Sequence, residues 1–204
     1  MGSLWSETSE LPSFGRLNNE IHTDVLIIGG GMAGILCASM LKQAGVNYVL
    51  AEADTICSGI TKNTTAKVTS EHGLIYDKLI REFGVERARM YLEANEAALE
   101  KYRELCRETD CDFETKDAFV YSLSNEFKIE KELEALGKIG FPAEFADRLP
   151  LPFPVAGAVK FKNQAQFHPL KFVSVAAQGL KIYEHTAVRE LTKHTALTDY
   201  GTIT

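Results

Sequence analysis

The sequence predicts an α/β fold that begins with a strand–helix–strand unit near the N-terminus, and three observations support this prediction. Short apolar runs at 25–28 and 48–50 have the length and composition of buried strands. The segment between them opens with a glycine-rich turn and continues with helical periodicity. An acidic residue, Glu52, follows the second run. This order of features is the fingerprint of a Rossmann-like domain that binds a dinucleotide.

The turn has the spacing Gly29-x-Gly31-x-x-Gly34, and each glycine has a mechanical reason. Gly29 permits a tight turn off the first strand, and Gly31 lets the backbone approach a pyrophosphate. Gly34 permits close packing of the helix on the strand. The N-terminus of that helix offers unpaired N–H groups and a positive dipole end to phosphates. Ala38 on the expected buried face and Gly45 at the expected helix end agree with this reading.

The acid at the end of the second strand narrows the choice of ligand. Glu52 lies 23 residues after Gly29, where a carboxylate can accept hydrogen bonds from ribose hydroxyls. Its charge would repel a 2′-phosphate, which disfavours an NADP-type ligand. NAD dehydrogenases usually continue with another helix and strand of the same sheet, whereas this chain continues with a hydroxyl-rich loop at 55–71 and a long segment of different pattern. This arrangement favours FAD, and an NAD-binding dehydrogenase domain stays an alternative.

The middle of the chain alternates between helical and strand patterns. Apolar residues at helical spacing predict a helix from 75 to 106, with glutamates on its solvated face. Residues 118–123 have the pattern of a strand. Ser124 has the chemistry of an N-cap for a helix that ends at 136 and is closed by Gly137.

Prolines interrupt the chain before it returns to the first domain. Four of them lie between 140 and 154 and exclude regular structure over much of that span. Beyond them we expect short strands at 156–161 and 165–167, a helix at 170–179 introduced by His168-Pro169, a strand at 182–188 and a hairpin at 195–204.

These patterns predict a polar lead-in at 1–22, a dinucleotide-binding domain at 23–73 and 166–204, and an inserted substrate-type domain of α+β pattern at 74–165. We expect both domains to be incomplete, because no strand returns the chain to the first sheet near its end. The sequence is therefore interpreted as an N-terminal fragment of a longer protein.

Composition and charge exclude several classes of function. The net charge of −6 over 204 residues provides no basic surface, so nucleic acid is not expected as a partner. No apolar run reaches the ~20 residues that a membrane-spanning helix needs. The N-terminus lacks the basic start and apolar core of a secretory signal. We expect a cytoplasmic protein.

The cysteines and histidines predict no metal site. Cys37 lies in the first expected helix and is interpreted as a core residue. Cys106 and Cys111 have no matching pair of Cys or His elsewhere, and the five histidines are scattered. Reduced thiols agree with a cytoplasmic location.

Two long runs carry a resemblance to a known family. GGGMAGILCASMLKQAGVNYVLAEA and CSGITKNTTAKVTSEHGLIY resemble the FAD-dependent oxidoreductases of the D-amino-acid oxidase, glycine oxidase and sarcosine oxidase group. TTAKVTSEHGLIY, FHPLKFV and IYEHTAVREL are most similar to one subfamily, whose longer members end in a Rieske iron–sulfur domain. The resemblance covers nearly the whole chain. It implies FAD as the cofactor and oxidation of an amine or amino acid by hydride transfer to the flavin.

The resemblance also implies which residues hold the cofactor. The turn glycines, with the N–H groups of Met32 and Ala33, would bind the pyrophosphate, and Glu52 would bind the adenosine ribose. A later segment would run alongside the pyrophosphate and flavin, and the Val188 backbone would contact the adenine. The expected cofactor-binding residues are Gly29, Gly31, Met32, Ala33, Gly34, Glu52, Ala53, Ser58, Thr64, Thr65, Ala66, Lys67 and Val188.

No residue is assigned a catalytic role, because family members need no strong acid or base beside the hydride. Lys67, His72, Tyr76 and Tyr121 are candidates to face a substrate, although a structural or cofactor-lining role suits each of them better. A Rieske cluster needs Cys and His ligands that these residues do not supply, so it would lie in the missing C-terminal part. The alternative function is a non-catalytic flavin-binding or electron-transfer portion of a longer protein.

Overall fold

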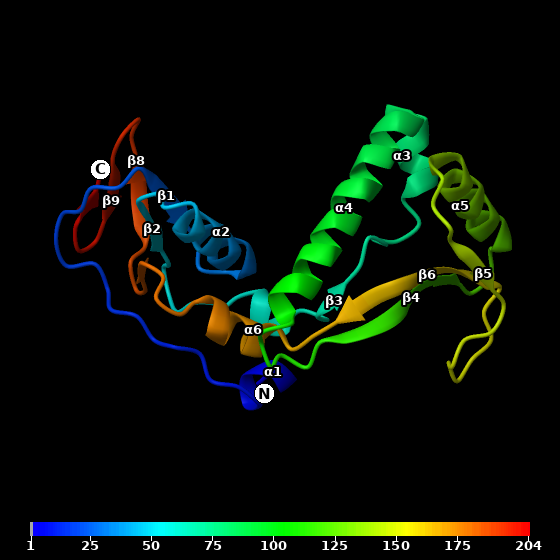
Figure 1. Cartoon of the computed structure of the whole chain (residues 1–204), viewed down its shortest axis with the longest axis horizontal. Coiled ribbons are helices and arrows are strands. Elements are labelled where there is room, and N and C mark those ends of the chain that lie inside the picture. Colours follow the sequence, from blue (N-terminus) through cyan, green and yellow to red (C-terminus); the bar gives the residue numbers. More distant parts are fainter. Residues whose placement is uncertain (1) are drawn as a thin grey trace. The chain divides into compact units, whose positions relative to one another are not determined.

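The computed structural model describes residues 2–204 and divides the chain between two units (Figure 1). Unit 1 contains residues 2–65, 109–111 and 168–204, and unit 2 contains residues 66–108 and 112–167. The chain first crosses from one to the other between Thr65 and Ala66. This crossing precedes the boundary at 73 that the sequence suggested, because residues 67–68 already pair with a strand of unit 2.

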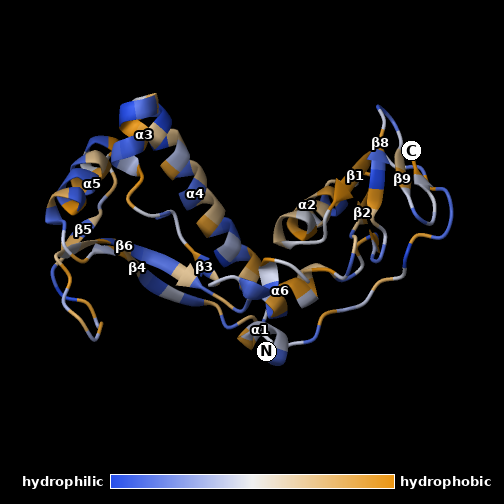
Figure 2. Ribbon diagram, turned by 180° about the vertical axis from the view of Figure 1, so that it is seen from behind, coloured by the Kyte–Doolittle hydropathy of each residue, from blue (hydrophilic) through white to orange (hydrophobic). Residues whose placement is uncertain are grey.

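Unit 1 is built on the strand–helix–strand unit that the glycine motif predicts. Its parallel sheet has the order β1-β2-β7, in which Val25 is paired with Tyr48 and Leu50 with Ile182. The elements are β1 (Val25–Ile28), α2 (Met32–Gln43), β2 (Tyr48–Ala51) and β7 (Ile182–Tyr183). Figure 2 shows the hydrophobic character of β1 and β2. The α/β fold with a Rossmann-like unit is confirmed.

The remainder of unit 1 contains short helices and an antiparallel sheet of order β10-β9-β8. The hairpin expected at 195–204 is present, whereas the strand expected at 182–188 is split between two sheets. Pro169 is the first residue of its helix, as predicted. The elements are α1 (Leu4–Glu7), the 3-10 helix η1 (Thr61–Asn63), α6 (Pro169–Ala176), β8 (Val188–Leu191), β9 (Ala196–Thr198) and β10 (Thr202–Ile203).

The polar lead-in is fastened to unit 1 by specific contacts. The indole N–H of Trp5 donates to the Thr64 carbonyl at 2.9 Å. Leu17 is fully buried, and its N–H donates to the Thr186 hydroxyl at 3.0 Å. The buried carboxylate of Glu184 accepts the N–H groups of Phe14 at 2.8 Å and Ile56 at 2.7 Å. These contacts make the lead-in part of the folded unit.

Unit 2 contains an antiparallel sheet and three helices. Strand order is β3-β6-β4, with β5 also paired to β6. Residues of all three helices form a core with Val159 and Phe161 of β6. The elements are β3 (Lys67–Val68), α3 (Tyr76–Phe83), α4 (Val85–Cys106), β4 (Glu114–Ser122), α5 (Glu126–Ile139), β5 (Glu144–Ala146) and β6 (Gly157–Gln166).

Several element boundaries in unit 2 differ from the sequence predictions. Gly84, with a φ of +82°, separates α3 from α4, so the helix predicted from 75 to 106 is two helices. Asn125 caps α5 in place of Ser124, and its side chain accepts the Lys128 N–H. Gly137 lies within α5. The left-handed residue that ends the helix is Gly140, at φ +89°. The helix extends this far because its last residue, Ile139, is buried in the core.

The strands of unit 2 also correct the prediction. The two short strands expected at 156–161 and 165–167 form one strand, β6, whose pairing with β4 contains an irregularity after Lys116. Strand β5 lies in the proline-rich span. Among residues 2–204, no helix combines the length and apolarity required to cross a bilayer.

Candidate functional site

The glycine turn of unit 1 has the backbone geometry that the motif requires. Gly29 has a φ of +105°, and its N–H donates to the Ala51 carbonyl at 2.9 Å. A Cβ added to Gly34 would lie 2.0 Å from the Gly29 carbonyl oxygen. The helix therefore packs on the turn more closely than any side chain at that position permits.

Gly31 has a different environment from Gly34. It is the N-cap of α2, and a Cβ added there would meet only the Thr61 hydroxyl, at 3.5 Å. Packing within the protein does not require a glycine here, whereas close approach of a ligand to the backbone does. The next N–H, that of Met32, donates to the Thr61 hydroxyl at 3.1 Å. Ala33 lies in the same first turn, whose N–H groups have no acceptor within the helix.

Thr61 is a site residue that the sequence analysis did not identify. It lies in η1, far along the chain from α2, yet its hydroxyl accepts the Met32 N–H. The threonines of the 55–71 loop look alike in the sequence, so only the tertiary contact distinguishes Thr61 from its neighbours.

Glu52 stands directly beside the glycine turn. Its Oε2 accepts the Gly30 N–H at 2.6 Å, and its Oε1 accepts the Asp54 N–H at 2.9 Å. The N–H of Cys57 donates to the Gly30 carbonyl at 3.0 Å, which ties the following loop to the turn. Burial raises the pKa of the Cys57 thiol to about 11, so this thiol is a packing group. Ala53 is exposed next to Glu52.

The other expected cofactor residues lie farther along unit 1 or in unit 2. Val188 lines a cavity of about 260 Å³ together with Ile28, at the end of β1. Ser58, Thr64 and Thr65 lie on the segment that leads from β2 out of unit 1. Ala66 and Lys67 belong to unit 2. The structure thus brings together the turn residues and Glu52 through direct contacts.

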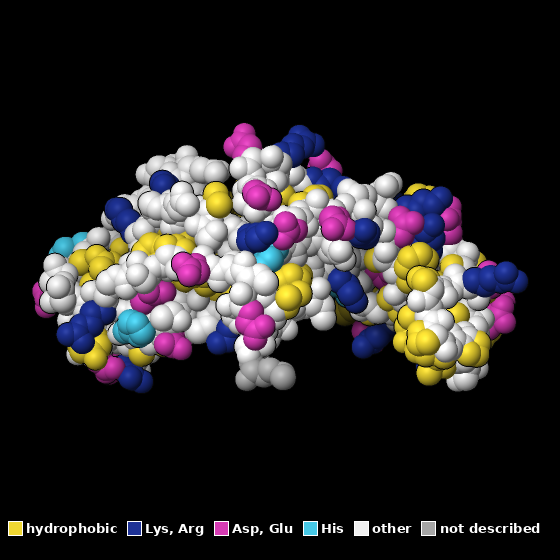
Figure 3. All heavy atoms as spheres, turned by 90° about the horizontal axis from the view of Figure 1, so that it is seen from below, with side chains coloured by type: hydrophobic (Ala, Val, Ile, Leu, Met, Phe, Trp, Pro, Cys, Tyr) yellow, Lys and Arg dark blue, Asp and Glu magenta, His cyan; other side chains and the backbone are white. Residues whose placement is uncertain are grey.

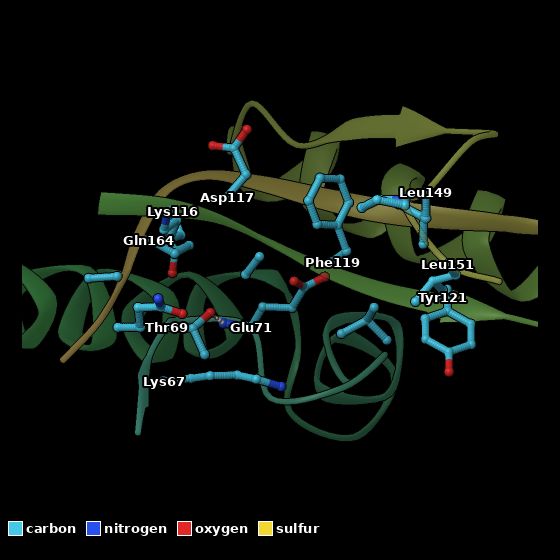
Figure 4. A pocket seen from close by; sticks show the side chains of 15 residues that line it. Lys67, Thr69, Glu71, Lys116, Asp117, Phe119, Tyr121, Leu149, Leu151 and Gln164 are labelled. Carbon is cyan, nitrogen blue, oxygen red and sulfur yellow. Dashed lines mark hydrogen bonds between the residues drawn. The ribbon is translucent and has the colours of Figure 1, made fainter. Parts of the chain in front are cut away.

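A cavity of about 330 Å³ opens in unit 2, and Lys67 lines it (Figure 4). Its walls come from four segments: β3 with the residues that follow it, β4, the loop at 149–151, and the end of β6 at 164–166. We call it the unit 2 pocket; its principal side chains are Lys67, Thr69, Glu71, Lys116, Asp117, Phe119, Tyr121, Leu149, Leu151 and Gln164. Apolar side chains gather on the surface at the right of Figure 3. Phe145 of β5 and Phe153 are among the exposed aromatic side chains of unit 2.

Glu71 is the unusual group in this pocket, and the sequence analysis did not identify it. Only 6% of the residue is exposed. Neither carboxylate oxygen has a hydrogen-bond partner within the described residues. Burial, followed by the charge of Glu132, raises the Glu71 pKa to about 8; the Val120 N–H and the Lys67 ammonium lower it only in part.

The four candidates for substrate contact have different environments. Lys67 and Tyr121 line the unit 2 pocket. Tyr76 is fully buried in the core, and its hydroxyl donates to the Ser70 carbonyl at 2.6 Å. His72 is exposed, with Nδ1 at 2.9 Å from the Tyr91 hydroxyl. Tyr76 is therefore a structural residue.

The thiols and acids of the described chain offer no evident metal centre. In residues 2–204, no group of three or more His, Cys, Asp and Glu side chains is arranged to hold a metal ion. No disulfide joins the four cysteines in the described part of the chain. Cys37 is exposed on α2, so its interpretation as a core residue is wrong. The buried residues of α2 are Ile35 and Ala38.

The turn of unit 1 fits a dinucleotide. The space above Gly31 is open, the first turn of α2 supplies backbone N–H donors, and the carboxylate of Glu52 ends the neighbouring strand. These are the donors and acceptor that a pyrophosphate and an adjoining ribose need.

Comparison with known proteins agrees with this geometry. Residues 24–204 match the family described as DAO, FAD dependent oxidoreductase. The chain is 39% identical over 200 residues to a putative Rieske 2Fe-2S iron–sulfur protein, YhfW, of Bacillus subtilis, covering 94% of this chain and 39% of the relative. It is 26% identical over 198 residues to gamma-glutamylputrescine oxidoreductase of Escherichia coli, covering 89% of this chain and 46% of the relative.

A solved structure shows the same fold. The L-proline dehydrogenase of P. horikoshii superposes with a TM-score of 0.70 at 17% identity, covering 93% of this chain and 51% of the dehydrogenase. The chain spans less than half the length of the two curated relatives. The matched family uses FAD, so FAD is the cofactor in place of the NAD alternative. The chain belongs to the DAO family of FAD-dependent oxidoreductases.

Proposed function

We propose that this chain is the FAD-binding part of an enzyme that oxidises an amine or an amino acid. The observation that carries the proposal is the open turn at Gly31, which packing does not explain and a bound pyrophosphate does. The E. coli relative, whose name gives a substrate derived from putrescine, supports an amine.

Most of the proposed cofactor contacts come from unit 1, and their geometry there supports them. The N–H groups of Met32 and Ala33 bind the pyrophosphate, and Thr61, which now accepts the Met32 N–H, gives it up to the phosphate. Glu52 retains lone pairs for ribose hydroxyls while it holds the Gly30 N–H. Ala53 lies beside that ribose, and Val188 lies beside the adenine in the cavity it shares with Ile28. The segment from Ser58 through Thr64, Thr65, Ala66 and Lys67 follows the pyrophosphate and flavin.

The chemistry belongs to the cofactor, and the protein supplies binding and orientation. FAD, when bound, accepts a hydride from the carbon that carries the amine nitrogen. The chain positions the dinucleotide through backbone N–H groups, which donate hydrogen bonds and take no part in proton transfer. Unit 2 supplies a pocket of suitable size for a small organic substrate.

We further propose that the natural protein is longer and acts in the cytoplasm. The B. subtilis relative is named as a Rieske protein and extends well beyond the matched region, which supports a C-terminal part with an iron–sulfur cluster. That name also favours a second function, in which this chain passes electrons between flavin and cluster without oxidising an amine itself. The four cysteines, which form no disulfide within residues 2–204, support a reducing location.

The test uses the full natural polypeptide. We expect it to purify with the visible absorption of oxidised flavin, and to bleach when mixed anaerobically with an amine or amino acid. Flavin that is retained but is reduced only by an electron donor would favour the electron-transfer function. A protein that holds no flavin would contradict both functions.

A further inference from the structure

The unit 2 pocket contains a charged group that the fold leaves without a hydrogen-bond partner. Glu71 is more than nine-tenths buried, and neither of its carboxylate oxygens accepts a hydrogen bond of standard geometry within residues 2–204, although the Val120 N–H is close enough to lower its pKa in part. Glu132 and Glu184 are also buried, yet each accepts two backbone N–H groups. A buried carboxylate without a partner is costly. The exception at Glu71 leaves an acceptor available to a partner within the pocket.

The neighbouring acid and one neighbouring base are already engaged with other side chains. Lys116 pairs with Glu114 at 2.7 Å, and Asp117 pairs with Lys160 at 2.8 Å. Lys67 of β3 is exposed and forms no hydrogen bond with Glu71. The cation that Glu71 lacks is not supplied by these side chains.

The walls around this carboxylate are largely apolar. Figure 4 shows the Glu71 carboxylate directed toward Phe119, with Leu149, Leu151 and Tyr121 along the same side of the pocket. Phe119 and Tyr121 are 39% and 42% exposed, so their rings are accessible to a ligand. A positive nitrogen on an apolar body complements this combination.

We propose that the unit 2 pocket binds an organic ammonium ion, with its nitrogen on the Glu71 carboxylate and its apolar body against Phe119, Tyr121 and Leu151. This inference rests on the proposed function and specifies its substrate class as an apolar amine. An α-amino acid is a poorer ligand, because its carboxylate adjoins the ammonium and would be placed close to Glu71 in a site of low dielectric constant.

Binding of the ammonium is coupled to release of a proton. Before a ligand binds, the Glu71 pKa of about 8 keeps this side chain mostly neutral at pH 7. Burial raises this pKa most, followed by the charge of Glu132 on α5. Lys67 on β3 opposes this effect. Tyr76 on α3 stays protonated, because burial raises its pKa. Glu71 must ionise to hold the cation, so about one proton leaves for each ligand bound at neutral pH.

The experiment is calorimetric titration of the flavin-loaded full polypeptide with n-butylamine, n-butanol and norvaline, with the flavin reduced beforehand under anaerobic conditions so that it cannot accept a hydride from the ligand. We expect n-butylamine to bind about 10- to 100-fold more tightly than n-butanol, the range for a hydrogen bond to a charged group. We expect norvaline to bind more weakly than n-butylamine. Repeating the titration in two buffers of different ionisation enthalpy measures the released proton.

The matched variants are Glu71→Gln and Glu134→Gln, both in unit 2. Glu134 is exposed on α5 and does not line the pocket, so Glu134→Gln should leave affinity and proton release unchanged. Glu71→Gln should lose the preference for n-butylamine over n-butanol and the proton release. If Glu71→Gln does not fold, the preference of the unaltered protein for n-butylamine over n-butanol and norvaline still decides the question.

The outcomes distinguish failure of the ammonium site from failure of the proposed function. Equal affinity for n-butanol, tighter binding of norvaline, or unchanged binding of n-butylamine by folded Glu71→Gln would each overturn the ammonium site. The flavin absorbance of the same samples before reduction tests the proposed function separately. Loss of flavin with normal titrations contradicts cofactor binding and leaves the ammonium site standing.

Discussion

Gly31 and Gly34 lie in the same turn, yet they are constrained by different partners. A methyl group at Gly34 would collide with the Gly29 carbonyl, whereas one at Gly31 meets only the Thr61 hydroxyl at 3.5 Å. We predict that Gly34→Ala destabilises the protein by about 1–3 kcal/mol, the usual cost of overpacking. Gly31→Ala should cost at most about 1 kcal/mol, because alanine is a poorer N-cap than glycine, and should weaken FAD binding at least tenfold.

Denaturant unfolding and FAD titration of the two variants check this pair. Each variant serves as the control for the other, because the same methyl group is added within one turn. Equal losses of stability at both positions would show that Gly31 is a packing residue, and that the open space above it has no role in binding.

Glu71 should leave a signature in the pH dependence of stability. Its pKa of about 8 in the folded protein lies above the ordinary value of 4.5, so the folded state holds more protons than the unfolded state between these values. The Glu71 contribution is therefore fully present below pH 4.5 and is lost as the pH rises through 8. The free energy of unfolding should fall by at most about 1.4 kcal/mol per pH unit.

Urea unfolding at several pH values between 5 and 8, with and without Glu71→Gln, isolates this effect. The variant should show the smaller slope, because its amide does not titrate. If the free energy of unfolding changes with pH equally in the two proteins, water must reach the Glu71 carboxylate in the folded state.

The sequence predicts the residues of the glycine turn well, because backbone geometry there is set within a few positions. Gly29, Gly34 and Glu52 have the local arrangement that the motif implies. Thr61 and Glu71 could not be predicted, since their environments depend on segments distant in sequence. A hydroxyl or carboxylate in a polar loop has no local pattern that distinguishes a buried contact from a solvated one.

At the scale of elements, α5 supplies a cap for α3. Burial raises the pKa of Glu132 on α5, and its carboxylate accepts the N–H groups of Tyr76 at 2.7 Å and Asp77 at 3.0 Å. We predict that Glu132→Ala destabilises the protein by about 2 kcal/mol or more, because two donors at a helix N-terminus lose their acceptor. Chemical denaturation measures the change.

The control for this prediction is Glu134→Ala, two positions along the same helix and exposed. An exposed substitution of this kind should stay within about 0.5 kcal/mol of the unaltered protein. If Glu132→Ala is equally mild, solvent must reach the start of α3 and replace the carboxylate.

Element identity was easier to predict than element boundaries, for a physical reason. Periodicity predicts that α4 and α5 are helices, because many residues contribute to the pattern. The end of α5 depends on one residue, and either Gly137 or Gly140 satisfies the local rule for a left-handed cap. Burial of Ile139 in the unit 2 core decides between them, and no local pattern contains that information.

At the scale of the whole molecule, the strand that carries the motif is less covered than its neighbour. Ile28 of β1 is 53% exposed, whereas every residue of β2 is buried. Strands of parallel sheets are normally buried on both faces.

The curated relatives are more than twice as long as the matched region, so functional measurements belong on the full natural polypeptide.

The most direct test of the account is the structure of that polypeptide purified with its cofactor. We predict one FAD per chain, with its pyrophosphate hydrogen-bonded to the N–H groups of Met32 and Ala33 above Gly31. A pyrophosphate bound elsewhere, a side chain lying across the glycine turn, or a protein that retains no FAD would contradict it.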